Sequence, residues 1–114
     1  MGIEEFPTIE NFQRLPKRLI VKGGDSLLTQ SRDAVLSGLV INNLGQTVRE
    51  VVVHLVVFND KEIPEVNLSV KPDPDRLTQG TMASFSFLIE KFGKPVKNFY
   101  LYANWKYDDA GWNV

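Results

Sequence analysis

The stretch that decides the fold is REVVVHLVVFND, residues 49 to 60. Val, Leu and Phe occupy both alternating sets of positions within it, and residues of this kind favour strands over helices. A strand that is apolar on both faces is typical of the centre of a sheet with cover on both sides, or nearly so. We therefore expect a central strand here, ended by a turn at Asp60 and Lys61.

Further apolar runs with a period of two lie on both sides of this stretch and are separated by turn residues. They predict further strands over residues 19–22, 26–30, 34–42, 66–71, 82–90 and 96–107. Gly23 and Gly24 suit a turn with positive φ between the first two. Strands without intervening helices predict an all-β chain that forms an antiparallel sandwich or barrel of six or seven strands. The 19–30 region and the 66–71 strand are the expected edges, which could accept a partner's strand.

The composition is that of one ordinary soluble domain of 114 residues, with 43% apolar and 24% charged residues. The net charge of −1 supplies no basic field for nucleic acid or an anionic membrane. The absence of cysteine excludes disulfides and thiolate chemistry, and a single histidine excludes a His-rich metal site. Because no run approaches the roughly 18 apolar residues of a membrane helix, we expect no membrane insertion within this chain.

Residues 1–17 contain Pro7 and Pro16 without a sustained pattern, and they are expected to be a leader or linker segment. Residues 18–114 are then a single β-sandwich domain. The N-terminus carries acidic residues where a signal peptide would have a basic region and an apolar region, so no signal peptide is expected within this chain.

His54 is the only histidine, and the stretch VVVHLVV around it offers neither a nucleophile nor a carboxylate. We expect it to be partly buried on a sheet face and hydrogen-bonded to a neighbouring strand. No serine lies in a G-x-S-x-G elbow. The chain is therefore predicted not to be an enzyme, with no catalytic residues and no cofactor; a hydrolase built around His54 would need a cleft beside it.

The last predicted strand divides by alternation into two faces. Phe99, Leu101, Ala103, Trp105 and Tyr107 form the set predicted to face the core, and Tyr100, Tyr102, Asn104 and Lys106 form the surface set. Tyrosines two residues apart on a surface can bind a partner, or can simply cover a half-exposed sheet.

The end of the chain adds two further candidates. Trp112 could fold back on the same edge as Tyr100 and Tyr102. Asp108 and Asp109 are a weak candidate for a calcium site, with a plain turn as the alternative.

Two segments, SGLVINNLGQTVREVVVHLVVFND and LTQGTMASFSF, resemble the FxLYD family of bacterial and archaeal immunoglobulin-like domains, over residues 34 to 107. The corresponding positions are Gly38, Val40 and Asn42 for G-x-V-x-N, Gly45 in the following turn, residues 55–59 for F-x-L-Y-D, and Leu77, Gly80 and Phe85 for L-x-x-G-x-x-x-x-F. In the naming motif Leu, Val, Phe and Asn replace Phe, Leu, Tyr and Asp. The resemblance implies an immunoglobulin-like β-sandwich used for interaction, commonly exported or envelope-associated, with no catalytic residues to transfer.

These observations lead us to expect a non-enzymatic β-sandwich module that binds a protein partner and belongs to an envelope-associated or larger multidomain protein. Its binding residues would be Tyr100 and Tyr102 with Trp112. The alternative is a small carbohydrate-binding module that uses the same aromatic residues, steadied by calcium at Asp108 and Asp109. The sequence does not indicate an oligomeric state.

Overall fold

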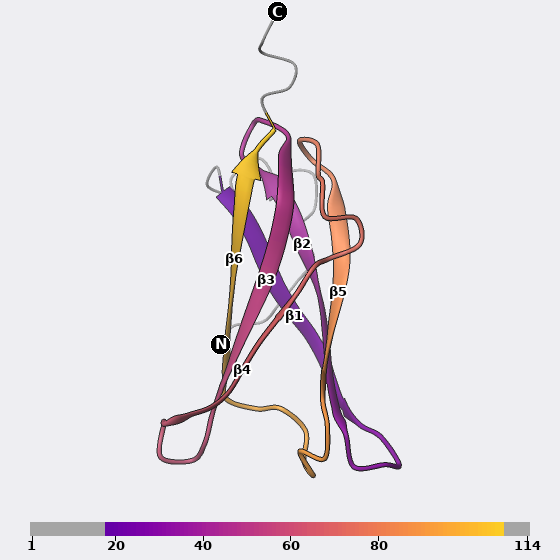
Figure 1. Ribbon diagram of the computed structural model, residues 1–114, viewed down its shortest axis with the longest axis vertical. Coiled ribbons are helices and arrows are strands. Elements are labelled where there is room, and N and C mark those ends of the chain that lie inside the picture. The colour runs from indigo at the N-terminus through magenta and orange to yellow at the C-terminus, as the bar shows by residue number, and fades with distance from the viewer. Residues whose placement is uncertain (1–17, 109–114) are drawn as a thin grey trace, which may run out of the picture.

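The computed structural model describes residues 18–108, and this part of the chain consists of strands joined by turns and loops (Figure 1). The strands are β1 (Arg18–Leu28), β2 (Ala34–Asn43), β3 (Val48–Phe58), β4 (Pro64–Val70), β5 (Met82–Ile89) and β6 (Phe99–Tyr107). All neighbouring strands pair antiparallel. The predicted all-β class is thus confirmed, with six strands. The described residues contain no helix long and apolar enough to cross a lipid bilayer.

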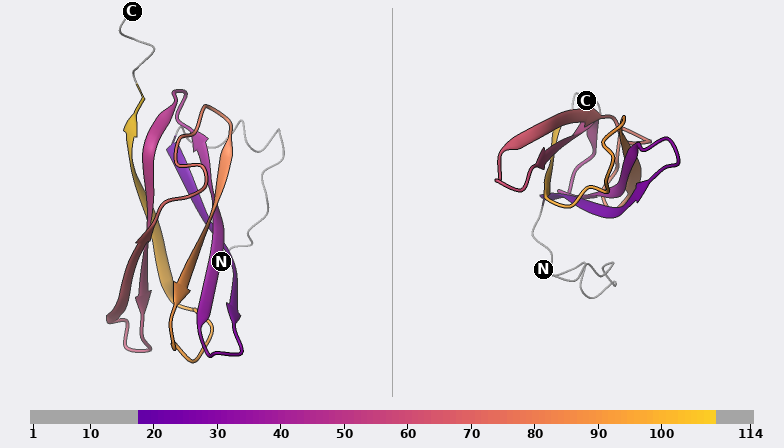
Figure 2. Two further views of the ribbon diagram at one scale, coloured as in Figure 1. Left: turned by 45° about the vertical axis from the view of Figure 1, so that its right-hand side comes forward. Right: turned by 90° about the horizontal axis from the view of Figure 1, so that it is seen from below.

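The six strands form two three-stranded sheets, which we call sheet A (β1-β2-β5) and sheet B (β4-β3-β6). The sheets face each other as a sandwich (Figure 2). The central strands are β2 and β3, so the predicted central position of residues 49–60 is confirmed. The two predicted edges are confirmed as well, because β1 and β4 each lie at the edge of a sheet.

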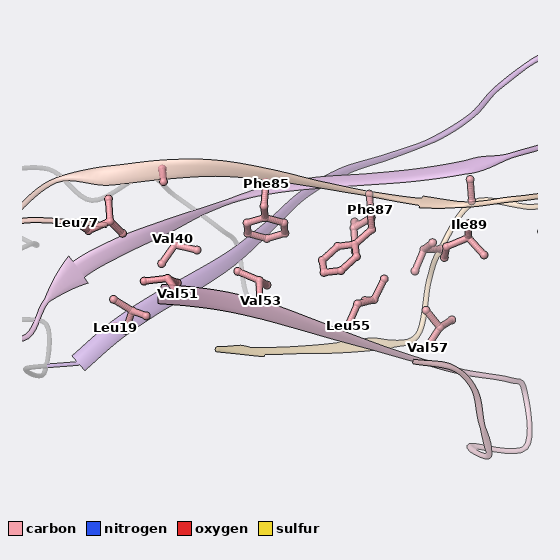
Figure 3. Packing of buried hydrophobic residues seen from close by; sticks show 14 of the residues in the cluster. Leu19, Val40, Val51, Val53, Leu55, Val57, Leu77, Phe85, Phe87 and Ile89 are labelled. Carbon is pink, nitrogen blue, oxygen red and sulfur yellow. The ribbon is translucent and has the colours of Figure 1, made fainter. Parts of the chain in front are cut away.

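The core fills the space between the sheets with residues that alternate along each strand. In β3 the inward residues Val51, Val53, Leu55 and Val57 are buried, and the residues between them are half-buried. The strand is therefore fully covered on one face only. Phe85 and Phe87 of β5 point toward β3 (Figure 3), with their rings edge to face and their centroids 5.7 Å apart.

The predicted turn at Gly23 and Gly24 is wrong. β1 runs through both glycines, neither has positive φ, and the register with β2 shifts at a bulge between Gly23 and Ser26. A Cβ on Gly23 would lie 3.0 Å from the Phe99 ring and 3.2 Å from Leu101 Cδ1. Gly23 therefore provides room for side chains of the opposite sheet, which explains a glycine in a strand interior without a turn.

The last strand begins at Phe99 rather than at residue 96. Val96 is buried in the preceding loop, and its N–H donates to Ser26 Oγ at 2.7 Å. The apolar pattern continues into Val96 because this residue packs against the core, although its backbone bonds to β1 instead of β3.

Asn42 is the one buried polar residue recorded within residues 18–108, and it organises the turn between β2 and β3. Its Nδ2 donates to the carbonyls of Gln46 at 2.7 Å and Leu77 at 2.9 Å, and its Oδ1 accepts from the Leu44 N–H at 2.9 Å. One side chain thus satisfies backbone groups of a tight turn and of the segment that leads to β5.

Candidate functional site

The outer face of sheet B carries the surface set of β6 predicted from alternation. Tyr100, Tyr102, Asn104 and Lys106 are exposed there. The predicted inward set packs partly buried against the core from Phe99 to Trp105. Tyr107 was also predicted to face the core but is exposed, because it lies at the very end of an edge strand.

Three aromatic rings lie against one another on this outer face, and we call His54, Tyr102 and Tyr100 the ring cluster. His54 and Tyr102 are direct cross-strand partners, with ring centroids 4.6 Å apart and an interplanar angle of 18°. The Tyr102 and Tyr100 rings follow at 5.8 Å and 29°. Tyr102 is 38% exposed and Tyr100 is 59% exposed. The cluster is therefore packed at His54 and open to solvent at Tyr100.

His54 also reaches the third strand of the sheet. Its Nδ1 lies 2.7 Å from Ser69 Oγ on β4, whereas its Nε2 is buried without a hydrogen-bond partner. The prediction of a partly buried histidine hydrogen-bonded across to a neighbouring strand is confirmed. The identity of the partner was missed, because the pairing of Ser69 with His54 depends on the strand order and leaves no signal at nearby sequence positions.

A serine within hydrogen-bond distance of a histidine is also the first element of a nucleophilic dyad. In a Ser-His-Asp triad the second ring nitrogen is oriented by a carboxylate, and backbone N–H groups form an oxyanion hole. The Nε2 of His54 has no such partner. His54 lies on the central strand β3, which pairs with β4 and β6, whereas Ser69 lies on the edge strand β4, which pairs on one side only.

Two grooves lie at the end of the sandwich where β3 ends, away from this pair. One, of about 240 Å³, is lined by Phe58, Phe92 and Lys97 among others. The second, of about 420 Å³, shares Phe58 and Lys97 with the first. Neither groove includes His54.

The candidate metal ligands are only partly described. Asp108 Oδ2 accepts from Arg76 Nε at 2.6 Å, and the Asp108 N–H donates to the Thr47 carbonyl at 3.0 Å. Asp109 and Trp112 lie outside the described residues. Within residues 18–108 no group of three His, Cys, Asp or Glu side chains is placed to hold a metal ion.

β6 borders the ring cluster with an open edge, because among the described strands it pairs only with β3. The other edges carry features that hinder strand addition. β1 has a bulge, β4 is short and begins at Pro64, and the β5 edge is bridged by Asp73 opposite Ser84. β6 extends over nine residues without proline or glycine. Its availability was not predicted, since it follows from the order of strands in sheet B.

Comparisons of this chain with family models, with curated proteins and with solved structures found no match.

Proposed function

We propose that this chain is a non-enzymatic, immunoglobulin-like β-sandwich module that binds a protein partner through the outer face of sheet B. The observation that carries the proposal is the ring cluster, an aromatic surface that opens to solvent at Tyr100 beside the open edge of β6.

The chemistry of the ring cluster suits a protein partner. Tyrosine combines a large apolar ring with a hydroxyl and is enriched among the residues that dominate binding energy at interfaces. Tyr102 lies between the rings of His54 and Tyr100, so part of its side-chain freedom is already lost before binding. The half-buried Val52 and Val56 add apolar surface on the same face. A partner segment in extended form could also pair with the β6 backbone and lay its side chains beside these rings.

A carbohydrate ligand has less support from the same geometry. A sugar stacks on an exposed ring face, but these rings lie nearly parallel and turn faces toward one another. Tyr102 has one face against His54, which leaves Tyr100 as the more accessible platform. A single exposed ring gives a weak basis for a sugar site.

Hydrolysis at His54 and Ser69 has less support still. The pair lacks an orienting carboxylate on Nε2, and neither of the two grooves described above includes His54. The order of strands in the two sheets is compatible with an immunoglobulin-like sandwich. The resemblance to the FxLYD family implies an envelope-associated or multidomain setting, and the proposal includes this setting.

The proposal can be tested with a photo-crosslinking amino acid at position 100 and, as a control, at the exposed Lys61 in the turn between β3 and β4. We expect a protein adduct from position 100 alone. Binding of that purified partner should weaken at least about 30-fold in the Tyr100→Ala/Tyr102→Ala variant, and change little in Lys106→Ala on the same face.

Unchanged binding by a folded double variant would refute the proposed site. A glycan array provides the competing outcome. Glycan binding that is lost in the double variant, together with no protein adduct, would replace the proposal with the carbohydrate-binding alternative.

A further inference from the structure

β6 lies at an edge of sheet B (Figure 1) and offers a row of backbone groups that no other described strand uses. The Asn98 carbonyl accepts from the Phe58 N–H at 2.8 Å, and the Asp108 N–H donates to the Thr47 carbonyl at 3.0 Å. Because backbone groups alternate between the two sides of a strand, the even-numbered residues of β6 bond to β3. The odd-numbered residues then direct their N–H and carbonyl groups to the open edge: Phe99, Leu101, Ala103, Trp105 and Tyr107.

The inner side of the same edge is incompletely covered. β5 is also an edge strand, yet its inward residues, such as Phe85 and Phe87, are buried. The inward residues of β6 from Phe99 to Trp105 are only half-buried, and Tyr107 is 47% exposed. An apolar flank and a row of backbone groups open to solvent therefore occur together on β6, and a further strand in sheet B would cover both.

The sequence of β6 suits pairing with a second copy of itself. Antiparallel pairing about a two-fold axis at Ala103 aligns all nine residues of the strand, because Ala103 is its central residue. The residues that face the open edge then pair with one another, which supplies up to about ten backbone hydrogen bonds. This number is comparable to the direct hydrogen bonds of a typical protein interface. The small side chains of the two Ala103 residues meet at the axis, where they leave room for close approach.

On the inner face of the sheet, this register brings apolar residues of the two copies together. Phe99 lies opposite Tyr107 of the second copy, and Leu101 lies opposite Trp105 of the second copy, so that large apolar side chains cover one another. Tyr107 is the inward position of β6 that the core of one chain leaves exposed. The second copy therefore supplies the cover that a single chain lacks at this end of the strand.

On the outer face of the sheet, Tyr100 lies opposite Lys106 of the second copy. An ammonium group is attracted to the face of an aromatic ring, so this pair is favourable. Tyr102 lies opposite Asn104, and no pair in this register joins two like charges. The ring cluster stays on the outer face and is not covered, because an added strand extends a sheet at its edge.

We propose that two copies of this chain pair antiparallel through β6, with the two-fold axis at Ala103, and join their copies of sheet B into one six-stranded sheet. The two ring clusters then lie on the same side of this sheet, since a two-fold axis perpendicular to a sheet keeps both outer faces together. A binding partner that presents two sites would gain affinity from both clusters. The dimer uses the edge of β6 and needs no other protein, so this inference does not rest on the proposed function.

Proline substitutions at two open edges test the dimer. Ala103→Pro removes an N–H that points to the open edge, so it should spare the pairing with β3 and remove two hydrogen bonds at the axis. Asn67→Pro is the matched control, because the N–H of Asn67 faces the open edge of β4. By sedimentation equilibrium we expect the unmodified chain to dimerise below about 100 µM. The Kd of the dimer should rise at least about tenfold in Ala103→Pro and change little in Asn67→Pro.

A chain that stays monomeric up to this concentration would overturn the proposal and would leave the β6 edge to a strand of a different protein. Equal increases of the Kd in the two proline variants would overturn it as well, because the β4 edge has no place in the proposed dimer. Far-UV circular dichroism checks that both variants keep their strands. If Ala103→Pro does not fold, cross-linking of cysteine variants decides between the same outcomes.

Cysteine pairs test the register in a chain that has no cysteine of its own. Tyr100→Cys and Lys106→Cys are mixed and oxidised, because in the proposed register these positions lie opposite each other with Cα atoms about 4.5 Å apart, within the range for a disulfide. Two copies of the same variant place their cysteines about 20 Å apart along the strands. We expect a disulfide-linked dimer from the mixture and none from either variant alone. Equal cross-linking of the mixture and the single variants, or none in the mixture, would overturn the proposed pairing.

Discussion

Replacing Asn42 by aspartate tests the polar network that joins the β2–β3 turn to the segment before β5. The substitution keeps the shape of the side chain and the oxygen that accepts from the Leu44 N–H. It removes the two side-chain N–H groups of Asn42, which donate to the Gln46 carbonyl at 2.7 Å and to the Leu77 carbonyl at 2.9 Å. At neutral pH a carboxylate oxygen would then face two carbonyl oxygens at a site with no solvent exposure.

The expected loss of folding stability follows from these contacts. Two hydrogen bonds contribute about 1 kcal/mol each, and a buried charge without a partner adds several kcal/mol more. The Leu77 carbonyl also accepts from the Val48 N–H, so it keeps one partner, whereas the Gln46 carbonyl loses the bond to Asn42. We expect Asn42→Asp to lower the free energy of unfolding at pH 7 by about 4 kcal/mol, a large part of the 5–15 kcal/mol typical of a domain.

The stability of the Asn42→Asp variant depends on pH with a definite sign. Burial beside two carbonyls favours the neutral carboxyl, so the folded-state pKa of the introduced Asp lies above its unfolded value of about 3.9. Between these two values the folded variant binds more protons than the unfolded chain, and its stability rises as the pH falls. The deficit relative to the original protein is therefore complete above the folded pKa and shrinks toward pH 4.

Asn59 offers a matched control. Its Oδ1 accepts from the N–H groups of Lys61 at 2.8 Å and Ile63 at 3.1 Å, and a carboxylate can accept both bonds. Asn59→Asp should therefore change the free energy of unfolding by less than about 1 kcal/mol at pH 7, and its effect should not improve on acidification. Urea unfolding followed by tryptophan fluorescence at pH 7 and pH 4.5 measures both variants. The reasoning would be refuted if both variants lost the same free energy of unfolding, or if the free energy lost by Asn42→Asp were larger at pH 4.5 than at pH 7.

Two further predictions concern packing and metal. A Cβ on Gly38 would lie 2.5 Å from Phe85 Cζ and also clash with a backbone carbonyl of β1, so Gly38→Ala should lower the free energy of unfolding by about 3 kcal/mol. Ser37→Ala, on the exposed neighbour, should stay within about 0.5 kcal/mol, and similar urea midpoints for the two would contradict the packing argument. Because Arg76 holds the Asp108 carboxylate, calcium is expected to leave the melting temperature unchanged relative to a chelator. A rise with calcium that disappears in Asp108→Asn would instead support the metal site.

The alternation of apolar residues was sufficient to predict the side chains of β6 that pack against the core from Phe99 to Trp105, although it failed at Tyr107. The same alternation is clear in β5. Ala83, Phe85 and Phe87 are buried with exposed residues between them, because a strand turns successive side chains to opposite faces. Alternation does not predict where a strand begins or continues, because that depends on contacts with residues distant in sequence. Gly23 looks like a turn residue because the sequence does not show the Phe99 ring that needs its space. Val96 looks like part of a strand because a buried loop residue is equally apolar.

The candidate site was predictable only in part for a related reason. Period two places Tyr100 and Tyr102 together on the surface of one strand, which the structure confirms. The contacts of His54 with Tyr102 and Ser69 arise from pairing across three strands that are distant in sequence. Strand order depends on the packing of the whole chain, so neither these contacts nor the open edge of β6 could be predicted from local patterns.

The positions that carry the family resemblance and those of the ring cluster have different physical roles. Gly38 makes room for the Phe85 ring, and Asn42 satisfies the backbone of a turn, so substitution at either position acts first on stability. Tyr100 lies on the surface, and its loss leaves the core between the sheets intact. The proposed binding can therefore be tested by substituting Tyr100 and Tyr102 in a domain that stays folded. A test of the proposed binding must therefore address the exposed surface, because the positions matched to the FxLYD pattern, such as Gly38 and Asn42, act on packing and on a turn.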